Sequence, residues 1–577
     1  MKLTGSQILF RALKEEQVET IFGLPGGAVL DIFDELYRSD VNHILVRHEQ
    51  GAIHAADGYA RASGRVGVCL VTSGPGATNT VTGIANAYMD SIPVVVLTGQ
   101  VSTMLIGNDA FQEVDITGIT RPCTKHNFLV RRVDELGRTI REAFKIARSG
   151  RPGPVLIDLP KDMMQSTADV ETLSHALTYP EERQEPIEES CARALWLVRK
   201  AKKPLLFVGG GVILGKASEE LRAFVRKLDL PVISSLMGLG AYPGTDPRWL
   251  GMVGMHGTYY ANMAISHCDL LIAVGVRFDD RVTSKLDAFA PHAQIVHIDI
   301  DPTSIEKMVK THVGIVSDCR PALQTLNRML DEDPSMVPGE RTRAWLEQVA
   351  KWKAKMPLTY HPGERIKPQH VIERLYKLTR GEAIVTTEVG QNQMWAAHYY
   401  HFDHPNTFIS SGGLGTMGFG LPAAIGAQVA CPDRVVVDIA GDGSIQMNIQ
   451  EMATAVHYGL PVKVIILNNR YLGMVRQWQE LFYGRRYSQT DLDHGPNFVK
   501  LAEAYGARGF RAEKPEDVDP TLRAALEAQG PVILDFQVEP EEGVYPMVKP
   551  GASLTEMDLG NGKVLAGSAV PEKVGAV

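Results

Sequence analysis

Two short polar motifs in the last third of the chain could hold a divalent cation. Asp442 lies between Gly441 and Gly443 and is followed by Ser444, and Asn469 ends the run 467–469. Carboxylate and amide oxygens are ligands that Mg²⁺ accepts, and a protein-bound Mg²⁺ commonly takes further oxygens from phosphates. Glycines let the main chain approach a phosphate closely, and a helix start beyond them favours an anion. These residues predict a metal-bound diphosphate site.

The elements around the two motifs explain how they could meet. Residues 435–438 and 462–467 are apolar runs that we predict as strands, and residues 449–458 have a helical pattern. In such a βαβ unit the two strands are parallel, so both motifs lie at the same edge of the sheet. This spacing resembles the diphosphate motif of thiamine-dependent enzymes.

A competing motif lies just upstream. Gly413, Gly415 and Gly418 match a GxGxxG pattern, and Asp438 follows at the distance of a dinucleotide fingerprint. An NAD-binding function is therefore an alternative, as is a nucleotide-binding module without enzyme activity. In the context of the diphosphate motif we instead expect a loop that packs on thiamine, with Met417 under the bent cofactor.

Thiamine catalysis needs a carboxylate beside the pyrimidine N1′, which promotes loss of the proton from C2. Glu49 is the best candidate, because it follows a predicted strand at 44–46 and begins a helix rich in small residues. The alternative is an ordinary first-turn glutamate that complements the helix dipole.

Apolar runs that alternate with helical patterns predict three α/β blocks. We expect doubly wound parallel sheets in an N-terminal domain (1–165), a central domain (191–340) and a C-terminal domain (367–545) that holds the diphosphate motifs. Linkers are expected at 166–190 and 341–366, and a tail at 546–577. The predicted strands are at 44–46, 66–71, 94–97, 155–157, 203–208, 232–233, 270–274, 295–298, 383–385, 407–409, 435–438, 462–467 and 532–534.

Composition excludes several classes of protein. The 577 residues carry a net charge of -8, which gives no general attraction to nucleic acid or anionic membranes. Six dispersed cysteines form no CxxC pair, which argues against a zinc site or a disulfide framework. The N-terminus is unlike a signal peptide, and no run of 18 uncharged apolar residues occurs, so we expect a cytoplasmic protein without a membrane span.

With these motifs in place, the chain is similar over roughly residues 1–550 to the catalytic large subunits of the acetohydroxyacid synthase (acetolactate synthase) family. The segments that carry the resemblance are 22–28, 47–50, 72–79, 109–113, 150–154, 236–240, 254–257, 275–282 and 473–478. The resemblance implies a transferase with thiamine diphosphate, Mg²⁺ and a flavin, FAD, that does not turn over. It also implies that 1–165 is the pyrimidine-binding domain, 191–340 the FAD-binding domain and 367–545 the diphosphate-binding domain.

The implied reaction is decarboxylation of pyruvate and ligation of the hydroxyethyl carbanion to a second 2-keto acid. Pyruvate as acceptor gives 2-acetolactate and 2-ketobutyrate gives 2-aceto-2-hydroxybutyrate, early steps in valine, leucine and isoleucine biosynthesis. Arg281 matches the cation for the acceptor carboxylate, which suits its planar fork, and Trp478 matches the contact to the acceptor's alkyl group. The alternative for Arg281 is a solvated charge cluster, and the alternative for Trp478 is a tryptophan of the hydrophobic core.

By resemblance, the remaining site residues fall into groups. The catalytic residues are Glu49, Gln112 and Lys161, and the substrate contacts are Gly27, Ala28, Phe111, Arg281, Met474 and Trp478. Thiamine diphosphate is expected at Pro25, Glu49, Pro75, Asn79, Val389, Gly390, Gln391, Asn392, Gly415, Met417, Asp442, Gly443, Ser444, Asn469, Leu472, Gly473 and Met474, with the metal at Asp442, Asn469 and Tyr471. FAD is expected at Arg151, Gly209, Gly210, Gly211, Leu236, Met237, Gly254, Met255, His256, Gly275, Arg277, Asp279, Val282, Asp299, Ile300, Asp318 and Cys319.

The resemblance also implies partners: a homodimer or homotetramer with active sites between subunits, and a small regulatory subunit. Two alternatives are an FAD-dependent pyruvate oxidase, in which the flavin would be redox-active, and glyoxylate carboligase, which lacks the activating glutamate. Asn392 is a departure, since members of the family usually carry His there; Asn can still donate a hydrogen bond.

Overall fold

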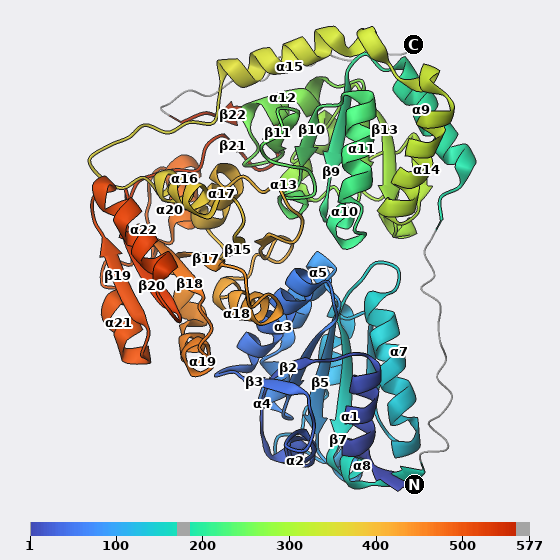
Figure 1. Cartoon of the computed structure of the whole chain (residues 1–577), viewed down its shortest axis with the longest axis vertical. Helices are drawn as coiled ribbons and strands as arrows, with labels where there is room; N and C mark the ends of the chain where they lie inside the picture. Colours follow the sequence, from blue (N-terminus) through green and yellow to red (C-terminus); the bar gives the residue numbers. More distant parts are fainter. Residues whose placement is uncertain (1, 170–184, 561–577) are drawn as a thin grey trace. The chain divides into compact units, whose positions relative to one another are not determined.

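The computed structural model describes residues 2–169 and 185–560, and three six-stranded sheets organise them (Figure 1). The described residues form two compact units. Unit 1 covers 1–182, 363–393 and 409–540, and unit 2 covers 183–362, 394–408 and 541–577, apart from the residues outside the described ranges. Helices cover both faces of each sheet, so the predicted α/β class with three parallel sheets is confirmed.

The first sheet of unit 1 has the strand order β3-β2-β4-β5-β7-β6, with every neighbouring pair parallel. Side chains alternate between its faces, so Ile21 packs with helices α1 and α7, and Phe22 packs with α3 and α5. The strands are β2 (Thr20–Leu24), β3 (Asn42–Leu45), β4 (Gly67–Val71), β5 (Val94–Gln100), β6 (His126–Leu129) and β7 (Val155–Pro160). The helices are α1 (Gly5–Glu15), α2 (Leu30–Leu36), α3 (Glu49–Ser63), α4 (Pro75–Thr78), α5 (Val81–Asp90), α6 (Ile116–Thr120), α7 (Leu136–Arg148) and α8 (Lys161–Gln165). A small antiparallel pair joins β1 (Lys2–Thr4) to β8 (Thr167–Asp169).

The second sheet of unit 1 has the order β16-β15-β17-β18-β20-β19, and β15, β17, β18, β20 and β19 pair in parallel. Its strands are β15 (Ile384–Thr387), β16 (Phe408–Ile409), β17 (Val436–Gly441), β18 (Lys463–Asn468), β19 (Arg508–Ala512) and β20 (Val532–Gln537). The helices of this part are α16 (Pro368–Thr379), α17 (Gln391–Tyr399), α18 (Gly420–Ala430), α19 (Met452–His457), α20 (Gly473–Phe482), α21 (Phe498–Tyr505) and α22 (Val518–Glu527).

Helices α3 and α18 join the two sheets of unit 1 into one hydrophobic core. They approach so closely that a Cβ on Gly58 of α3 would lie 2.2 Å from the carbonyl oxygen of Ala423. A Cβ on Gly426 of α18 would lie 1.9 Å from the carbonyl oxygen of Ala55. Only glycine fits at these two positions, because any side chain would meet main-chain atoms. The first and third predicted blocks therefore belong to one compact unit.

Unit 2 is built on the sheet β11-β10-β9-β12-β13-β14, which is parallel throughout. Leu206 and Val208 of β9 face α9, α11 and α14, whereas Leu205 and Phe207 face α12 and α15. The strands are β9 (Pro204–Val208), β10 (Val232–Ser234), β11 (Trp249–Met252), β12 (Leu270–Val274), β13 (Gln294–Asp299) and β14 (Val313–Val316). The helices are α9 (Glu188–Lys200), α10 (Gly210–Leu214), α11 (Ser218–Leu228), α12 (Tyr259–His267), α13 (Asp280–Thr283), α14 (Cys319–Glu332) and α15 (Arg343–Lys355).

Three stretches expected to connect or trail the domains have structure of their own. Half of 341–366 is helix α15, whose Trp345 is 3% exposed and donates from Nε1 to the Pro204 carbonyl oxygen (3.0 Å). The expected tail contributes strands β21 (Met547–Val548) and β22 (Met557–Asp558) to the core of unit 2, and residues 561–577 lie outside the described residues. In 166–190, β8 and the start of α9 flank residues 170–184, which also lie outside them. A charged helix with one buried stripe reads as a linker in sequence, because most of its residues are polar.

Within the described residues, the structure has no helix that is both long enough and apolar enough to cross a membrane.

Candidate active site

The predicted metal ligands meet at one edge of the second sheet of unit 1. Asp442 follows β17 and Asn469 follows β18, and these strands are parallel neighbours with Gly441 opposite Leu467. Asp442 is 4% exposed, and burial raises the pKa of its carboxyl to about 7. Its Oδ1 has no hydrogen-bond partner among the described residues. A buried, unpaired carboxylate oxygen is costly unless a cation compensates it, so this donor set fits Mg²⁺.

The amide of Asn469 is held in place beside Asp442. Its Oδ1 accepts from the main-chain N–H of Tyr471 (3.1 Å), and its Nδ2 donates to Oε1 of Gln391 (3.1 Å). A Cβ on Gly473 would lie 2.1 Å from that Gln391 oxygen and 2.6 Å from Asn469 Nδ2. The structure therefore brings Gln391, Asn469, Tyr471 and Gly473 together, and that they form one cofactor site stays a prediction.

No cluster of three or more histidine, cysteine, aspartate or glutamate side chains within 2–169 and 185–560 could hold a metal.

The turn after β15 approaches the same edge. Gly390 has a φ of +153°, and Cβ atoms built on Gly390 and Gly441 would lie 2.7 and 3.4 Å from Oδ1 of Asn392. The Asn392 Nδ2 donates to the carbonyl oxygens of Glu388 (3.0 Å) and Ile439 (2.8 Å). Both N–H bonds of the Asn392 side-chain amide thus go to main-chain carbonyl groups, and they link the end of β15 to β17. A hydrogen bond from Asn392 to a phosphate would need one of these bonds to break.

Glu49 is the first residue of helix α3, which packs on the first sheet of unit 1. It is 8% exposed, and one of its oxygens accepts from Nδ2 of Asn79 (2.9 Å). The other oxygen would lie 3.4 Å from a Cβ on Gly76. Asn79 and Gly76, which follow β4, therefore lie beside the Glu49 carboxylate, and their place in a thiamine diphosphate site stays a prediction. Within the described residues, we find no hydrogen bond between this cluster and the Asp442 cluster.

Sequence reasoning missed Glu451, which supports the start of the Glu49 helix. Glu451 is fully buried, and its two carboxylate oxygens lie 3.1 and 3.2 Å from the main-chain nitrogen of Arg47. It also accepts from the hydroxyl of Thr454 (2.6 Å), and burial raises its pKa to about 7. A carboxylate beside a helix N-terminus complements the helix dipole. The contact spans about 400 positions of chain, for which a single sequence carries no signal.

The expected substrate residues form smaller groups. Lys161 donates from Nζ to the carbonyl oxygen of Gly27 (3.2 Å), beside the buried Ala28. Phe111 is 88% exposed, and Gln112 has a φ of +59° with its main chain against Gly74.

The two expected contacts to the acceptor acid, one aromatic and one cationic residue, lie in other parts of the chain. Trp478 is partly buried on α20, after Leu472, Gly473 and Met474, with its ring 5.6 Å from that of Phe482. The Arg281 side chain, in unit 2, is 60% exposed and lies 3.7 Å from Asp280. It is accessible to a small anion.

The expected flavin residues of unit 2 follow the carboxyl ends of its strands. Gly209, Gly210 and Gly211 follow β9, and Gly275 follows β12, on the two sides of the point where the strand order reverses. Such switch points are where open α/β sheets bind ligands. Cβ atoms on Gly209 and Gly211 would meet Gly275 at 2.0 and 2.6 Å, so close packing of the chain already requires both glycines.

The other expected flavin residues follow neighbouring strands or turns. Asp299 ends β13, and Asp318 caps α14 beside the buried Cys319. His256 is 9% exposed, its Nδ1 has no partner among the described residues, and burial lowers its pKa to about 3. A neutral imidazole with an unused nitrogen fits a polar, uncharged ligand edge. Arg151, in unit 1, donates to Ser91 Oγ (2.8 Å). The remaining members of the set in unit 2 are Leu236, Met237, Gly254, Met255, Arg277, Asp279, Val282 and Ile300.

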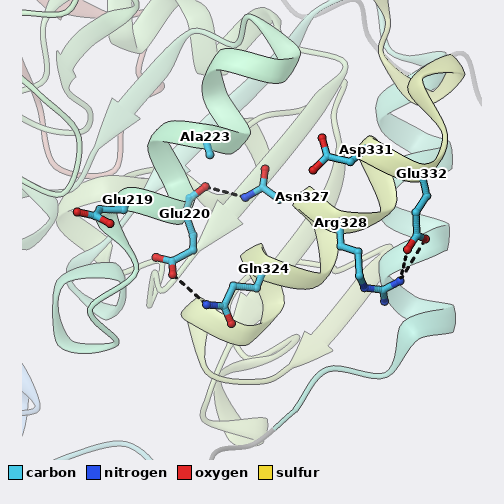
Figure 2. A pocket seen from close by; sticks show the side chains of 8 residues that line it. All are labelled: Glu219, Glu220, Ala223, Gln324, Asn327, Arg328, Asp331 and Glu332. Atoms are coloured by element: carbon cyan, nitrogen blue, oxygen red, sulfur yellow. Dashed lines mark hydrogen bonds and ion pairs between the residues drawn. The ribbon is translucent and has the colours of Figure 1, made fainter.

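A surface pocket of about 610 Å³ between α11 and α14 contains none of the expected site residues (Figure 2). Glu220 pairs with Arg320 (2.8 Å), and Arg328 pairs with Glu332 (2.9 Å). These charges are already compensated within the surface, so we assign this pocket no function.

Comparison with known proteins agrees with the geometry. Residues 3–119 match the N-terminal TPP binding domain of thiamine pyrophosphate enzymes, 191–326 the central domain and 388–536 the C-terminal TPP binding domain. The acetolactate synthase isozyme 3 large subunit of Escherichia coli (strain K12) is 50% identical over 567 residues, covering 96% of this chain and 98% of that protein. The acetolactate synthase large subunit of Parasynechococcus marenigrum is 51% identical over 564 residues (96% and 91%), and the probable one of Methanocaldococcus jannaschii is 47% identical over 566 (96% and 95%). The chain therefore belongs to the acetolactate synthase large-subunit family of thiamine pyrophosphate enzymes.

Proposed function

We propose that this chain is the catalytic subunit of an acetolactate synthase that decarboxylates pyruvate and joins the remaining two-carbon unit to a second 2-keto acid. Two molecules of pyruvate give one 2-acetolactate and one CO2, and 2-ketobutyrate as acceptor gives 2-aceto-2-hydroxybutyrate. The observation that carries the proposal is the unpaired, buried Oδ1 of Asp442 beside Asn469, at the joined ends of β17 and β18. The names of the relatives support this reaction over an oxidase or a glyoxylate carboligase.

In this proposal Asp442, Asn469 and the main-chain oxygen of Tyr471 hold Mg²⁺ on the diphosphate. When bound, thiamine diphosphate supplies the carbon nucleophile of the reaction. Glu49 holds a proton against the pyrimidine N1′, and Asn79 orients its carboxylate through the 2.9 Å hydrogen bond. A carboxylate that is buried and oriented in this way is suited to proton sharing at a ring nitrogen.

Arg281 binds the carboxylate of the acceptor acid, because its side chain is 60% exposed and a planar guanidinium matches the geometry of a carboxylate. Trp478 contacts the alkyl group of the acceptor, where one methyl group is worth about 1–3 kcal/mol of discrimination. FAD binds at the strand ends of unit 2 without turning over. The small regulatory subunit, the dimer or tetramer and the placement of Glu49 and Asp442 in different subunits are parts of the same proposal.

The first test is Glu49→Gln, which keeps the shape of the side chain and removes its charge. We expect most acetolactate formation from pyruvate to be lost while the bound FAD is retained. Glu219→Gln is the matched control, because Glu219 is also a first-turn glutamate of a helix and lies outside the site. Full acetolactate formation by Glu49→Gln would contradict the role of Glu49.

A second measurement separates the proposed reaction from pyruvate oxidation. Turnover with pyruvate under anaerobic conditions should leave the flavin absorbance unchanged and release one CO2 per acetolactate. Bleaching of the flavin without acetolactate would replace the proposal with an oxidase.

A further inference from the structure

A glycine-rich loop, defined here as residues 412–419, links β16 to α18 and carries Gly415 and Met417, the expected contacts to the thiamine ring. Its tip is accessible: Leu414 is 43% exposed, and a Cβ on Gly415 would find only Val389, at 4.0 Å. Gly415 and Gly418 have φ values of +74° and +87°, which favour glycine. An accessible tip with permissive backbone keeps one conformation only if the rest of the loop is fixed.

The first end of the glycine-rich loop is fixed by Asp90, the last residue of α5. The Asp90 carboxylate accepts from the main-chain N–H of Gly412 (3.0 Å) and of Gly413 (2.7 Å). Arg61 donates to the Asp90 carboxylate (3.0 Å) and to the carbonyl oxygen of Ser410 (2.9 Å). The Arg61–Asp90 ion pair therefore binds the main chain of the loop and of the residue that precedes it. The side chains of Arg61 and Asp90 are 6% and 0% exposed.

Further hydrogen bonds join this end to α3 and α5. Arg61 also pairs with Asp57 (2.6 Å), which accepts from Asn86 (3.1 Å). The hydroxyl of Ser411 donates to Asn86 (2.5 Å) and accepts from the main-chain N–H of Thr416 (2.8 Å). Charge-assisted hydrogen bonds of this kind are the strong ones in proteins, and a buried network that is satisfied specifies one geometry.

The second end is fixed by Glu388, which follows β15 and is fully buried. It accepts from the main-chain N–H of Gly418 (2.6 Å) and of Leu421 (3.3 Å), at the start of α18. Glu388 immediately precedes the turn 389–392 that approaches the diphosphate edge. One carboxylate therefore couples the glycine-rich loop to the diphosphate turn.

A second buried acid, Asp438 of β17, lies beside Glu388. Burial raises the pKa of Asp438 well above its usual range, and the neighbouring Glu388 raises it further. Burial also raises the pKa of Glu388 to about 8, while the main-chain N–H groups of residues 418–421 act in the opposite direction. Asp438 accepts from the hydroxyl of Thr386 (3.2 Å). Both buried carboxyl groups are therefore held by hydrogen bonds from the chain around them.

We propose that Asp90 and Glu388 are positioning residues that hold the glycine-rich loop at both ends and so place Gly415 and Met417 against the thiamine ring. The proposal rests on the proposed function, since it assumes that thiamine diphosphate binds at this loop. Neither residue touches the cofactor in this account; each acts through main-chain N–H groups. Asp90 lies outside the predicted motifs, and Glu388 directly precedes the predicted contacts 389–392; neither residue was itself predicted as a contact of thiamine diphosphate.

The test compares Asp90→Asn and Glu388→Gln, which are isosteric and place an amide N–H against main-chain N–H donors. For each variant we expect the half-saturating thiamine diphosphate concentration, measured with Mg²⁺ present, to rise about tenfold or more. We also expect faster hydrogen exchange in peptides that cover residues 412–421. FAD content and the KM for pyruvate should stay within about twofold of wild type, because the variants leave those residues in place.

Asp269→Asn is the matched control. The Asp269 carboxylate accepts from two consecutive main-chain N–H groups, those of Lys202 and Lys203 (both 2.8 Å), in the same manner as Asp90. It precedes β12, at the strand edge opposite the carboxyl ends. A general effect of losing such a carboxylate would appear in this variant as well, whereas a positioning effect would not.

Where Asp90→Asn or Glu388→Gln does not fold, Ser411→Ala and Glu388→Asp are the substitutes. Ser411→Ala removes the acceptor of Thr416 N–H and should shift the thiamine diphosphate dependence in the same direction. Glu388→Asp keeps a carboxyl group that can accept from main-chain N–H groups, so this variant should bind the cofactor more tightly than Glu388→Gln. Wild-type cofactor dependence and loop exchange in folded variants, with an active wild-type enzyme, would overturn this inference alone. A wild-type protein that neither binds thiamine diphosphate nor makes acetolactate would overturn the proposed function instead.

Discussion

The contact between α3 and α18 predicts a large effect for Gly426→Ala. The new Cβ would lie 1.9 Å from the Ala55 carbonyl oxygen, whereas ordinary contact begins at 3.4 Å, so the helices must separate by about 1.5 Å (3.4 minus 1.9). Both colliding groups are main chain, which no side-chain rotation can relieve. Overpacking of this kind costs about 3 kcal/mol of unfolding free energy, the upper end of its usual range.

The same displacement should reach the chemistry, because Glu49 is the first residue of α3. Misplacement of a catalytic group by 1 Å can cost on the order of a hundredfold in rate. We therefore expect Gly426→Ala to lower both the denaturation midpoint and acetolactate formation, while FAD, expected mainly in unit 2, remains bound.

The measurements are urea denaturation followed by circular dichroism, flavin content and turnover of pyruvate. Gly363→Ala is the control, since a Cβ there would meet only the end of Lys367, at 3.7 Å. A Gly426→Ala variant with wild-type midpoint and turnover would refute the close approach of α3 and α18 and the dependence of Glu49 on it.

Two further predictions concern buried acids. Asp442→Asn should weaken Mg²⁺-dependent binding of thiamine diphosphate by at least tenfold in calorimetry, and removing Mg²⁺ from wild type with EDTA should do the same; unchanged binding would exclude Asp442 as a ligand. Glu451 has its pKa raised from 4.5 to about 7, so it favours the folded state below pH 4.5 and loses that contribution as the pH rises to about 7. Relative to Glu451→Gln, the wild type should lose up to about 1.4 kcal/mol of unfolding free energy per pH unit across this window. The melting temperatures of the two proteins should therefore converge or cross between pH 4.5 and 8. Parallel curves of melting temperature against pH would contradict the assignment.

The strands that could be predicted from the sequence carry apolar runs, and they include the short strands β10 and β16. β4, β5, β9, β12, β17 and β18 are buried along their length, and their Val- and Ile-rich runs identify them. β19 (Arg508–Ala512) has burial only at its end and lies at the sheet edge, so its polar residues gave no strand pattern. Helix α15 was missed for a related reason, since only Trp345 and Val349 of its residues are buried.

That Asp442 and Asn469 lie at one sheet edge could be predicted because it depends only on two neighbouring strands, whereas their binding of a metal stays a prediction. Asp442 and Asn469 each follow a strand of one βαβ unit, and parallel pairing of consecutive strands places both at one edge whatever the rest of the chain does. The expected roles of Arg281, Trp478 and the flavin residues came from resemblance, and they stay predictions.

What the sequence by itself determined is the class of strands, the diphosphate edge and the family to which its motifs belong. Only the tertiary structure decided that Asn392 gives both N–H groups to the main chain, that Glu451 supports the Glu49 helix, and that Asp90 and Glu388 hold the glycine-rich loop. The physical reason is the distance along the sequence over which each kind of interaction acts. Periodicity and turn chemistry act over a few residues, whereas the Asp90 contact joins positions 322 and 323 apart, and only the packing of α3, α5 and α18 brings them within hydrogen-bond distance.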